Sequence, residues 1–392
     1  MNFLIILLAF GRRSISHTTM FKSPSVDFGN RSTSVSSQSR LIGILPGEGI
    51  GPELISICRN ILEVLVGDGQ CSIELREGGR IGIEAANHSG RELTDEVIEF
   101  CGQIFSEGGA ILAGPGGGRF VYNMRKEFDL YVKMNPLTYF KELDGATRLK
   151  FSKDATLDIM VVRENGQGLY QGQGHIEDGG KRIRQEFFYT EDAIMRVLST
   201  AVRAAQRRRK RLTVIAKRGG LSEVTRLWFN CAERAVADSG VELTTLDMDY
   251  AGYQFIAHPE EFDVVAIPNC FGDILADLGG IFMASRGNTY GASFDAKGNG
   301  VFQTNHGSAY DLAGHNVANP AGQIFSLAML LRDAFGMIRE SAWIEESVRT
   351  AWRDGSVTAD LMQPGATCVG TREMGAIVLE NLKAIIEKNS CR

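Results

Sequence analysis

The sequence predicts an α/β fold in which a largely parallel β-sheet is covered by helices. Short apolar segments typical of strands alternate along the chain with longer segments in which apolar residues recur at helical spacing. This alternation favours parallel strands joined by helices that pack on the sheet. The chain has 392 residues, which is enough for two domains of ordinary size.

Composition narrows the class of function. Hydrophobic residues make up 44% and charged residues 23% of the chain, as in an ordinary soluble enzyme. The net charge of -5 argues against a nucleic-acid partner. The seven cysteines form no CxxC pair, so we interpret them as reduced thiols in a reducing compartment. The six histidines form no close cluster, which argues against a zinc site.

Residues 1–40 are predicted to lie outside the fold, as a disordered or targeting extension. The apolar run at 2–10 is too short to span a membrane and lacks the flanks of a secretory signal, so no membrane partner is expected. Residues 11–40 are rich in Ser, Thr and Arg. They are either a mitochondrial transit peptide or an over-extended start, with translation beginning at Met20 or later. A cytoplasmic location is therefore favoured, with the mitochondrial matrix as the alternative.

The first part of the chain opens with a strand at 41–46, a glycine-rich loop at 47–53 and a helix over 54–66. A strand, a glycine loop and a helix can bind phosphate at the helix N-terminus, although many such loops are only tight turns. Further expected elements are strands at 73–75 and 110–113, a helix near 94–105, and a helical segment over 119–133. Asn135-Pro136 is expected to mark the point where the chain leaves the first domain.

The second part continues the alternation. Expected strands are 157–163, 182–190, 212–216 and 262–267, and expected helices are 193–208, 221–239, 253–258, 321–335, 344–353 and 374–388. The basic run at 207–211 is interpreted as a solvated helix end, where positive charge is favoured by the helix dipole.

Two blocks between residues 267 and 320 carry the most specific signal. In the first, Asp273 and Asp277 are four residues apart, so on a helix they share one face and repel each other. A hard divalent cation with oxygen ligands would offset that repulsion. The second block, from His306 to Pro320, is a polar, glycine-bearing loop before an apolar helix, and such a loop can wrap a nucleotide.

Together these blocks resemble the signature region of the metal-dependent β-decarboxylating dehydrogenases, which include isocitrate dehydrogenase and 3-isopropylmalate dehydrogenase. Matching segments run from about residue 43 to 382. The resemblance implies the two-domain isocitrate/isopropylmalate dehydrogenase-like fold, which is not a Rossmann fold. It also implies an NAD-binding domain of residues 41–130 plus 284–392, and a smaller domain of residues 131–283 that holds the dimer interface.

The same resemblance implies the roles of five residues. Asp249, Asp273 and Asp277 would hold Mg2+ or Mn2+, with Lys217 as the base and Tyr170 as the acid. Asp249 and Lys217 would act in the partner's site, which predicts a homodimer with shared active sites. A nearby cation should lower the pKa of both Lys217 and Tyr170. Considered singly, each aspartate could be an ordinary surface residue, Lys217 an exposed lysine and Tyr170 a core or interface tyrosine.

For the cofactor, Asp311 and Leu312 occupy the position that separates NAD-using from NADP-using relatives. A carboxylate accepts hydrogen bonds from the free ribose hydroxyls and repels a 2'-phosphate, so we predict NAD. By the same resemblance His306, Gly307 and Asn319 would line the adenosine pocket.

Three departures from the family pattern fall on the substrate side. Arg125 and Arg163 match two of the three substrate arginines, but the third position is Asn135. The chain is also shortened between residues 115 and 125, in the loop that touches the variable side group in relatives. Gly219 stands where relatives have an asparagine. Arg119 and Lys133 are the candidates to replace the lost charge.

We therefore predict NAD-dependent oxidative decarboxylation of a small hydroxy-dicarboxylate, a malate-type 3-carboxy-2-hydroxy acid that is neither isocitrate nor 3-isopropylmalate. One alternative is an enzyme acting on isocitrate, 3-isopropylmalate, tartrate or homoisocitrate despite the departures. The other is a catalytically silent regulatory subunit of such an enzyme. All five metal and acid–base positions are present, which weighs against the silent subunit.

Overall fold

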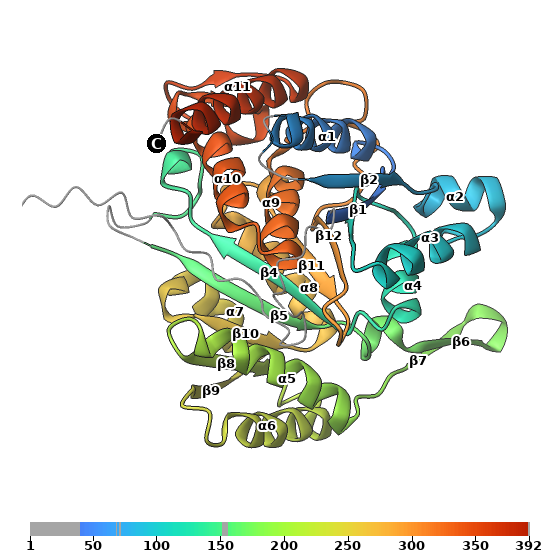
Figure 1. Cartoon of the computed structure of the whole chain (residues 1–392). Coiled ribbons are helices and arrows are strands. Elements are labelled where there is room, and N and C mark those ends of the chain that lie inside the picture. Colours follow the sequence, from blue (N-terminus) through green and yellow to red (C-terminus); the bar gives the residue numbers. More distant parts are fainter. Residues whose placement is uncertain (1–39, 68, 70–71, 151–155, 391–392) are drawn as a thin grey trace, which may run out of the picture.

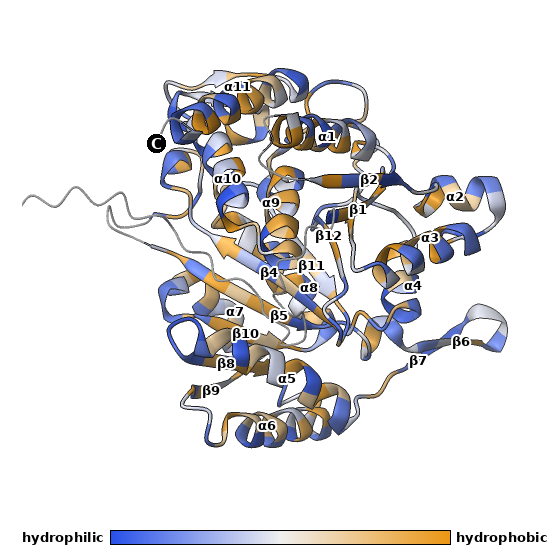
Figure 2. Ribbon diagram, in the orientation of Figure 1, coloured by the Kyte–Doolittle hydropathy of each residue, from blue (hydrophilic) through white to orange (hydrophobic). Residues whose placement is uncertain are grey.

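The fold is organised around one ten-stranded sheet. The computed structural model describes residues 40–67, 69, 72–150 and 156–390, so the prediction for residues 1–39 lies outside the described part. The strand order is β2-β1-β3-β12-β11-β4-β5-β10-β8-β9 (Figure 1). Apolar residues concentrate in these strands and on the helix faces that cover them (Figure 2).

One half of the sheet is built from the two ends of the chain. Its strands are β2 (Ile73–Glu77), β1 (Arg40–Leu45), β3 (Ala110–Ala113), β12 (Gly300–Thr304) and β11 (Tyr290–Phe294). Its helices are α1 (Gly51–Gly67), α2 (Gly82–Ser89), α3 (Asp95–Ser106), α4 (Phe120–Glu127), α9 (Ala321–Phe335), α10 (Ile338–Arg353) and α11 (Thr371–Ser390), with a small sheet of β13 (Ser356–Val357) and β14 (Thr367–Cys368). Helix α9 is apolar on all sides and almost wholly buried, because it packs on β11 and β12 and is itself covered by α1 and α10.

The other half comes from the middle of the chain. Its strands are β4 (Val132–Thr138), β5 (Asp158–Glu164), β10 (Val264–Ile267), β8 (Arg211–Ala216) and β9 (Glu242–Asp247). Its helices are α5 (Glu191–Gln206), α6 (Ser222–Val236), α7 (Met248–Ala257) and α8 (Asn269–Leu278). Strands β5, β10, β8 and β9 are parallel to one another, as the alternation of strands and helices predicted.

The centre of the sheet is antiparallel and was not predicted. Strand β11 pairs antiparallel with both β12 and β4, and β4 pairs antiparallel with β5. The β11–β4 contact joins the strands of residues 41–130 and 284–392 to those of residues 131–283 in one continuous sheet. The division into two domains at those boundaries stays a prediction.

Two predicted elements differ in extent from the observed ones. The helix expected over 119–133 ends at Glu127, because Asp129 takes a φ of 45°, which a helix cannot contain. Lys133 and Asn135 therefore lie in strand β4, inside the sheet. The strand expected at 182–190 is the shorter β7 (Arg182–Glu186), which forms an exposed hairpin with β6 (Gln173–Glu177) that extends from the body (Figure 1).

The basic run at 207–211 is partly structural, which corrects its interpretation as a solvated helix end. The Arg208 side chain is only 5% exposed. Its Nε donates to Asp263 Oδ1 at 2.9 Å, and its Nη2 donates to the carbonyl of Asp158 at 2.7 Å. The Asp263 side chain is fully buried and also accepts from the backbone N–H of Arg211. The run thus fastens the end of α5 to the strands beside it.

We expect Asp263→Ala to lower the free energy of unfolding by about 3 kcal/mol, because it removes the fully buried one of the two carboxylates that pair with the buried Arg208 guanidinium. Asp95→Ala is the matched control, since the Arg91–Asp95 pair is exposed and should contribute less than about 1 kcal/mol. Urea unfolding followed by circular dichroism measures both. Equal losses for the two variants would show that Asp263 has no special role.

Candidate active site

The predicted site residues gather where parallel strands end. Strands β5, β10 and β8 run in the same direction, so their carboxyl ends meet at one edge of the sheet, the usual place for a ligand in α/β folds. Arg163 lies at the end of β5, Lys217 directly follows β8, and α8 follows β10. The order of the strands therefore brings together residues that are far apart in sequence.

Arg163 links the sheet to helix α8. Its side chain is almost completely buried, and its Nη1 forms an ion pair with Asp273. Its Nη2 and Nε donate to Asn269 Oδ1 at 2.8 and 3.2 Å, and the Asn269 amide donates to the carbonyl of Gln167 at 3.0 Å. Asn269 thus fixes the plane of the guanidinium. This role of Asn269 was not predicted from the sequence, although Asn269 lies four residues before Asp273 in the same block.

Arg125 is buried with unused donors. It is 5% exposed, and its Nε and Nη1 have no hydrogen-bond partner within the described residues. Its guanidinium carbon lies 5.3 Å from the ring centroid of Tyr122. Burial, and then the nearby Arg163, lower the pKa of Arg125 to about 9. A buried guanidinium with free N–H groups is suited to bind a carboxylate, which would satisfy those groups.

Asn135 and Lys133 lie on the strand beside Arg163. The Asn135 amide donates to Asn305 Oδ1 at 2.7 Å and to the carbonyl of Tyr290 at 3.3 Å, so it is held inside the sheet. Its Oδ1 has no partner in the part of the chain that the structure describes. Burial, and then the charges of Arg125 and Arg163, lower the pKa of Lys133 to about 7.

Tyr170 lies in a short 3-10 helix, Leu169–Gln171, against the same group. Its ring meets that of Tyr122 edge-on at 5.6 Å, and the Arg163 guanidinium carbon is 5.7 Å from its centroid. Partial burial, a hydrogen bond with Cys270 and the charge of Asp273 raise the pKa of Tyr170. The sequence analysis expected a lower pKa. The difference arises because its neighbours in a single chain include a thiol and a carboxylate, which disfavour a phenolate.

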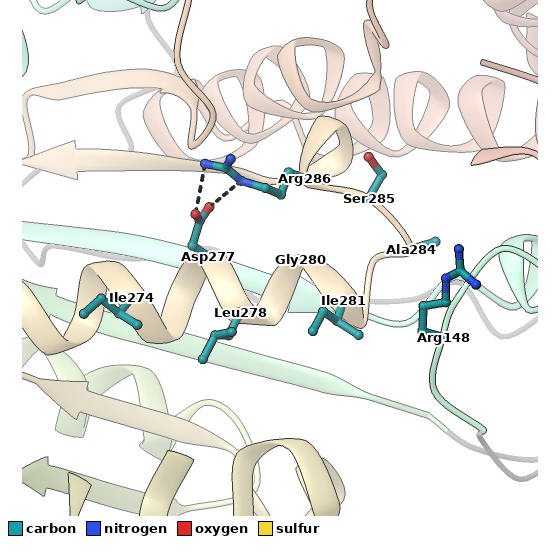
Figure 3. Close-up of a pocket in the computed structure, with 9 residues that line it drawn as sticks. All are labelled: Arg148, Ile274, Asp277, Leu278, Gly280, Ile281, Ala284, Ser285 and Arg286. Atoms are coloured by element: carbon teal, nitrogen blue, oxygen red, sulfur yellow. Dashed lines mark hydrogen bonds and ion pairs between the residues drawn. The ribbon is translucent and has the colours of Figure 1, made fainter. Parts of the chain in front are cut away.

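Asp273 and Asp277 both lie on α8, one turn apart, as predicted. Each is paired with an arginine. Arg163 pairs with Asp273, and with Lys133 and Arg125 it holds the pKa of that carboxyl below its usual value although burial opposes this. Arg286 binds both oxygens of Asp277, Nε to Oδ1 at 3.0 Å and Nη2 to Oδ2 at 2.9 Å (Figure 3). The pairing of Arg286 with Asp277 was not predicted from the sequence.

A cavity of 470 Å³ opens beside this second pair. Its wall is formed by Arg148, Ile274, Asp277, Leu278, Gly280, Ile281, Ala284, Ser285 and Arg286 (Figure 3). Most of these residues are apolar or glycine, so Asp277 and the two arginines are the groups that can fix a charged ligand there.

Asp249 and Lys217 form a separate pair. The Lys217 ammonium forms ion pairs with Asp249 and, at 3.4 Å, with Asp247. The hydrogen bond with Asp249 is the main cause that raises the pKa of Lys217. The prediction from the sequence was a lowered pKa of Lys217. Among residues 40–390, as far as they are described, no three His, Cys, Asp or Glu side chains meet to hold a metal ion. One chain thus offers two carboxylates suited to Mg2+ or Mn2+, those of Asp273 and Asp277, and Asp249 lies apart from them.

The glycine loop and the 306–320 loop are joined by Glu48. Its side chain is fully buried and accepts from Glu84 N at 2.9 Å, from Ser308 Oγ at 3.3 Å and from Gly117 N. Gly49 has a φ of 60° and lies against the Ser308 carbonyl, so a side chain at position 49 would clash. The shortened loop at Gly117 is therefore anchored to the candidate nucleotide loop.

The predicted cofactor residues are only partly free to meet a ligand. Gly307, Asp311 and Leu312 are exposed, and burial lowers the pKa of His306, which keeps its imidazole neutral. Asn319 is instead used within the fold. Its amide donates to Asn288 at 2.9 Å and to Asp360 at 3.0 Å, and its oxygen accepts from Ala321 N at the start of α9.

Buried arginines beside helix carboxylates at a sheet edge are suited to bind a small acid. Residues 41–378 match the isocitrate/isopropylmalate dehydrogenase family. The chain belongs to that family, whose members are NAD-dependent decarboxylating dehydrogenases that also use a divalent metal. The predicted family and fold class are confirmed.

Curated relatives and a solved structure agree with this assignment. The chain is 34% identical to a 3-isopropylmalate dehydrogenase of Aquifex aeolicus, over 88% of this chain and 97% of the relative. It is 35% identical to that of Carboxydothermus hydrogenoformans, over 86% and 94%. The crystal structure of isocitrate dehydrogenase from Methylococcus capsulatus superimposes with a TM-score of 0.76 at 28% identity, covering 88% of this chain and 99% of that one.

We expect Arg286→Gln to tighten Mn2+ binding about fivefold, because it removes a cation that occupies both oxygens of a half-exposed carboxylate. Isothermal titration calorimetry with MnCl2 measures this without turnover. Arg148→Gln is the matched control, since Arg148 is exposed in the same cavity wall and forms no ion pair with Asp277. Unchanged or weaker Mn2+ binding in Arg286→Gln would show that Arg286 does not compete with the metal.

Proposed function

We propose that this protein catalyses NAD-dependent, metal-assisted oxidative decarboxylation of a malate-type 3-carboxy-2-hydroxy acid that is neither isocitrate nor 3-isopropylmalate. The supporting observation is the buried pair of Arg125 and Arg163, of which Arg125 has unused donors. Guanidinium groups bind carboxylates bidentately and tightly where water is excluded. The substrate is therefore an acid whose carboxylates enter this pair.

The chain's own residues supply the proton steps. Arg125 and Arg163 hold and orient the carboxylates of the substrate. Lys217 of one subunit would take the hydroxyl proton, and Tyr170 would return a proton to the enol carbon after CO2 departs. A raised pKa keeps Tyr170 protonated and ready to donate. Bound NAD would accept the hydride, and a divalent cation held by the aspartates would supply positive charge to the enolate.

Lys217 must lose a partner before it can act as a base. In the single chain its pKa is raised above all by Asp249. If Asp249 turns toward the other subunit's carboxylates, Lys217 retains Asp247 alone and its pKa falls. The base is then activated only in the assembled, loaded site.

The side group of the substrate is the point on which this chain departs from its family. Asn135 replaces an arginine, and its amide is already engaged with Asn305. The loop before α4 is short and fastened by Glu48. A second candidate function is 3-isopropylmalate dehydrogenase itself, which the names of relatives 34 to 35% identical over nearly their whole length favour.

We expect the full chain with Mn2+ and NAD to oxidise one member of a panel of 2-hydroxy acids that carry a 3-carboxylate, with apolar, acidic, aromatic or phosphonate side groups. NADH absorbance measures turnover. NADP should be used poorly, because the exposed Asp311 repels a 2'-phosphate. Lys217→Ala should lower kcat about 100-fold or more, because it removes the general base.

The outcomes separate the candidates. Turnover confined to 3-isopropylmalate would replace the first candidate with the second. NAD binding without turnover of any acid would contradict both and favour a regulatory subunit.

We also propose a homodimer with shared sites. Exposed apolar side chains lie on α7 (Tyr250, Tyr253), on α8 (Ile274, Leu278) and on or just after the β6–β7 hairpin (Ile176, Ile183, Phe188). Large exposed apolar groups on several elements favour an interaction with another chain. The separation of Asp249 and Lys217 from Asp273 and Asp277 within one chain gives a second reason, since a partner subunit can bring them together.

We expect inactive Lys217→Ala and inactive Asp273→Asn chains to regain activity when refolded together. If each site uses Lys217 of one chain and Asp273 of the other, a hybrid dimer contains one intact site. A random mixture should then recover about a quarter of the wild-type activity for a two-fold dimer. The measurement is the NADH rate of the mixture against each variant alone. No recovery, despite hybrid dimers detected by native mass spectrometry, would place both residues of a site in one chain.

A further inference from the structure

We propose that Lys133 binds a carboxylate of the substrate and supplies the positive charge that Asn135 lacks. This inference rests on the proposed function, because it assigns a residue to the same substrate site. Lys133 lies on β4, two residues before Asn135, in an element that the sequence pattern had predicted to be helical.

The register of the sheet places Lys133 beside Arg163. Strands β4 and β5 are antiparallel, and Lys133 is the direct cross-strand partner of Arg163. Direct partners point to the same face of a sheet, with Cβ atoms close together. Asn135 shares that face, because side chains two residues apart on a strand point the same way. A cation at position 133 therefore occupies the row in which the family's third arginine would stand.

The Lys133 ammonium is buried and lacks a counter-ion of its own. Lys133 is 7% exposed, and no hydrogen bond or ion pair within the described residues holds its ammonium. The nearby carboxylates of Asp273 and Asp277 are already paired with Arg163 and Arg286. Buried charges are normally paired, and like charges on facing positions of a sheet repel each other.

Arg125, like Lys133, is a buried cation that lacks a partner for its charge. Two of its donors have no partner, and the charges of Arg125, Arg163 and Lys133 repel one another. Glu164 is buried nearby, but it directly follows Arg163 on β5, so its side chain points to the opposite face of the sheet. Its Oε1 accepts from the backbone N–H groups of Gly166 and Gln167, and its Oε2 has no hydrogen-bond partner within the described residues. The cluster of Arg125, Arg163 and Lys133 therefore lacks negative charge, which a dianionic substrate would supply. This is the physical reason to expect the acid to contact Lys133 as well as the two arginines.

Arg119, the other candidate for the lost charge, is less suited. It is exposed, its guanidinium lies 5.2 Å from the centroid of the Tyr122 ring, and it donates to the carbonyl of Tyr170 at 3.4 Å. Water stabilises an exposed charge and screens its attraction to an anion. Binding an anion therefore releases less free energy at an exposed cation than at a buried one. An ammonium also differs from the guanidinium it replaces, because it is a compact point charge rather than a planar fork. The contact at Lys133 is therefore monodentate, with one ammonium facing the carboxylate.

The test measures ligand binding first. Wild type, Lys133→Gln and Lys133→Arg are titrated with each enantiomer of malate, the smallest acid of the class, by isothermal titration calorimetry in the presence of Mn2+ and NADH so that no turnover occurs. Lys133→Gln should weaken malate binding about tenfold or more, because it removes one partner of a buried charge pair. Lys133→Arg should recover part of that loss. NAD binding and the thermal unfolding midpoint should stay close to wild type in both variants.

Two further variants serve as controls. Lys126→Gln removes an exposed lysine of α4 and should leave malate binding unchanged. Arg119→Gln should have a smaller effect than Lys133→Gln, and the reverse order would transfer the role to Arg119 and overturn the proposal. With the acid found in the panel, Lys133→Gln should raise KM about tenfold while kcat changes less, since the contact is made in the ground state as well as in the transition state.

The remaining outcomes separate this proposal from the proposed function. Normal malate binding and KM in Lys133→Gln, with an active wild type, would overturn the role of Lys133 and leave the function intact. Joint loss of malate binding, NAD binding and thermal stability would show a structural role and also overturn it. A wild type that turns over no acid but binds malate in a Lys133-dependent way would contradict the function and support Lys133. A wild type that binds no malate and turns over no acid of the panel would contradict both.

Discussion

The ion pair between Arg163 and Asp273 is the contact on which the rest of the site depends. It joins the end of β5 to the first turns of α8, and Asn269 fixes the guanidinium from the same helix. The position of Arg163 in turn sets that of Lys133 through the β4–β5 register. Tyr170 packs on the same guanidinium. One buried arginine thus orients a candidate metal ligand, a candidate acid and a second cation.

The single chain pairs most of its candidate catalytic and metal-binding groups with one another, and these are the groups that the proposed reaction needs. Asp277 is held by Arg286, Lys217 by Asp249, and Asp273 by Arg163. Each of these contacts must open or be shared when metal, substrate and the second subunit arrive. The hydrogen bond with Asp249 raises the pKa of Lys217, whereas burial and the hydrogen bond with Cys270 raise that of Tyr170. On the proposed function, the lower pKa of a working base would arise only in the assembled site.

Local patterns sufficed to predict α9 over residues 321–335 and β3 over 110–113, because apolar periodicity and flanking glycine or proline mark those segments directly. The pair of carboxylates on α8 was predictable for the same reason. Strands β11 and β12, and the strand rather than helix at Lys133, were not predictable in this way. Their conformation is fixed by antiparallel pairing with strands distant in sequence, and the left-handed Asp129 that ends α4 gives little signal.

Two of the three departures from the family pattern lie on one structural unit. Asn135 and Lys133 lie on β4, and the shortened loop precedes α4, which leads into β4. The third, Gly219, follows β8 close to Lys217. The proton-transfer and metal candidates lie on elements that follow β5. The proposed change in substrate would therefore involve mainly one strand and its approach, while the elements proposed to carry the reaction keep their arrangement. Moving a positive charge by two residues along β4 preserves its face of the sheet, whereas moving it by one would turn the side chain to the opposite face. This explains how a lysine at 133 can serve a site from which the arginine at 135 is missing.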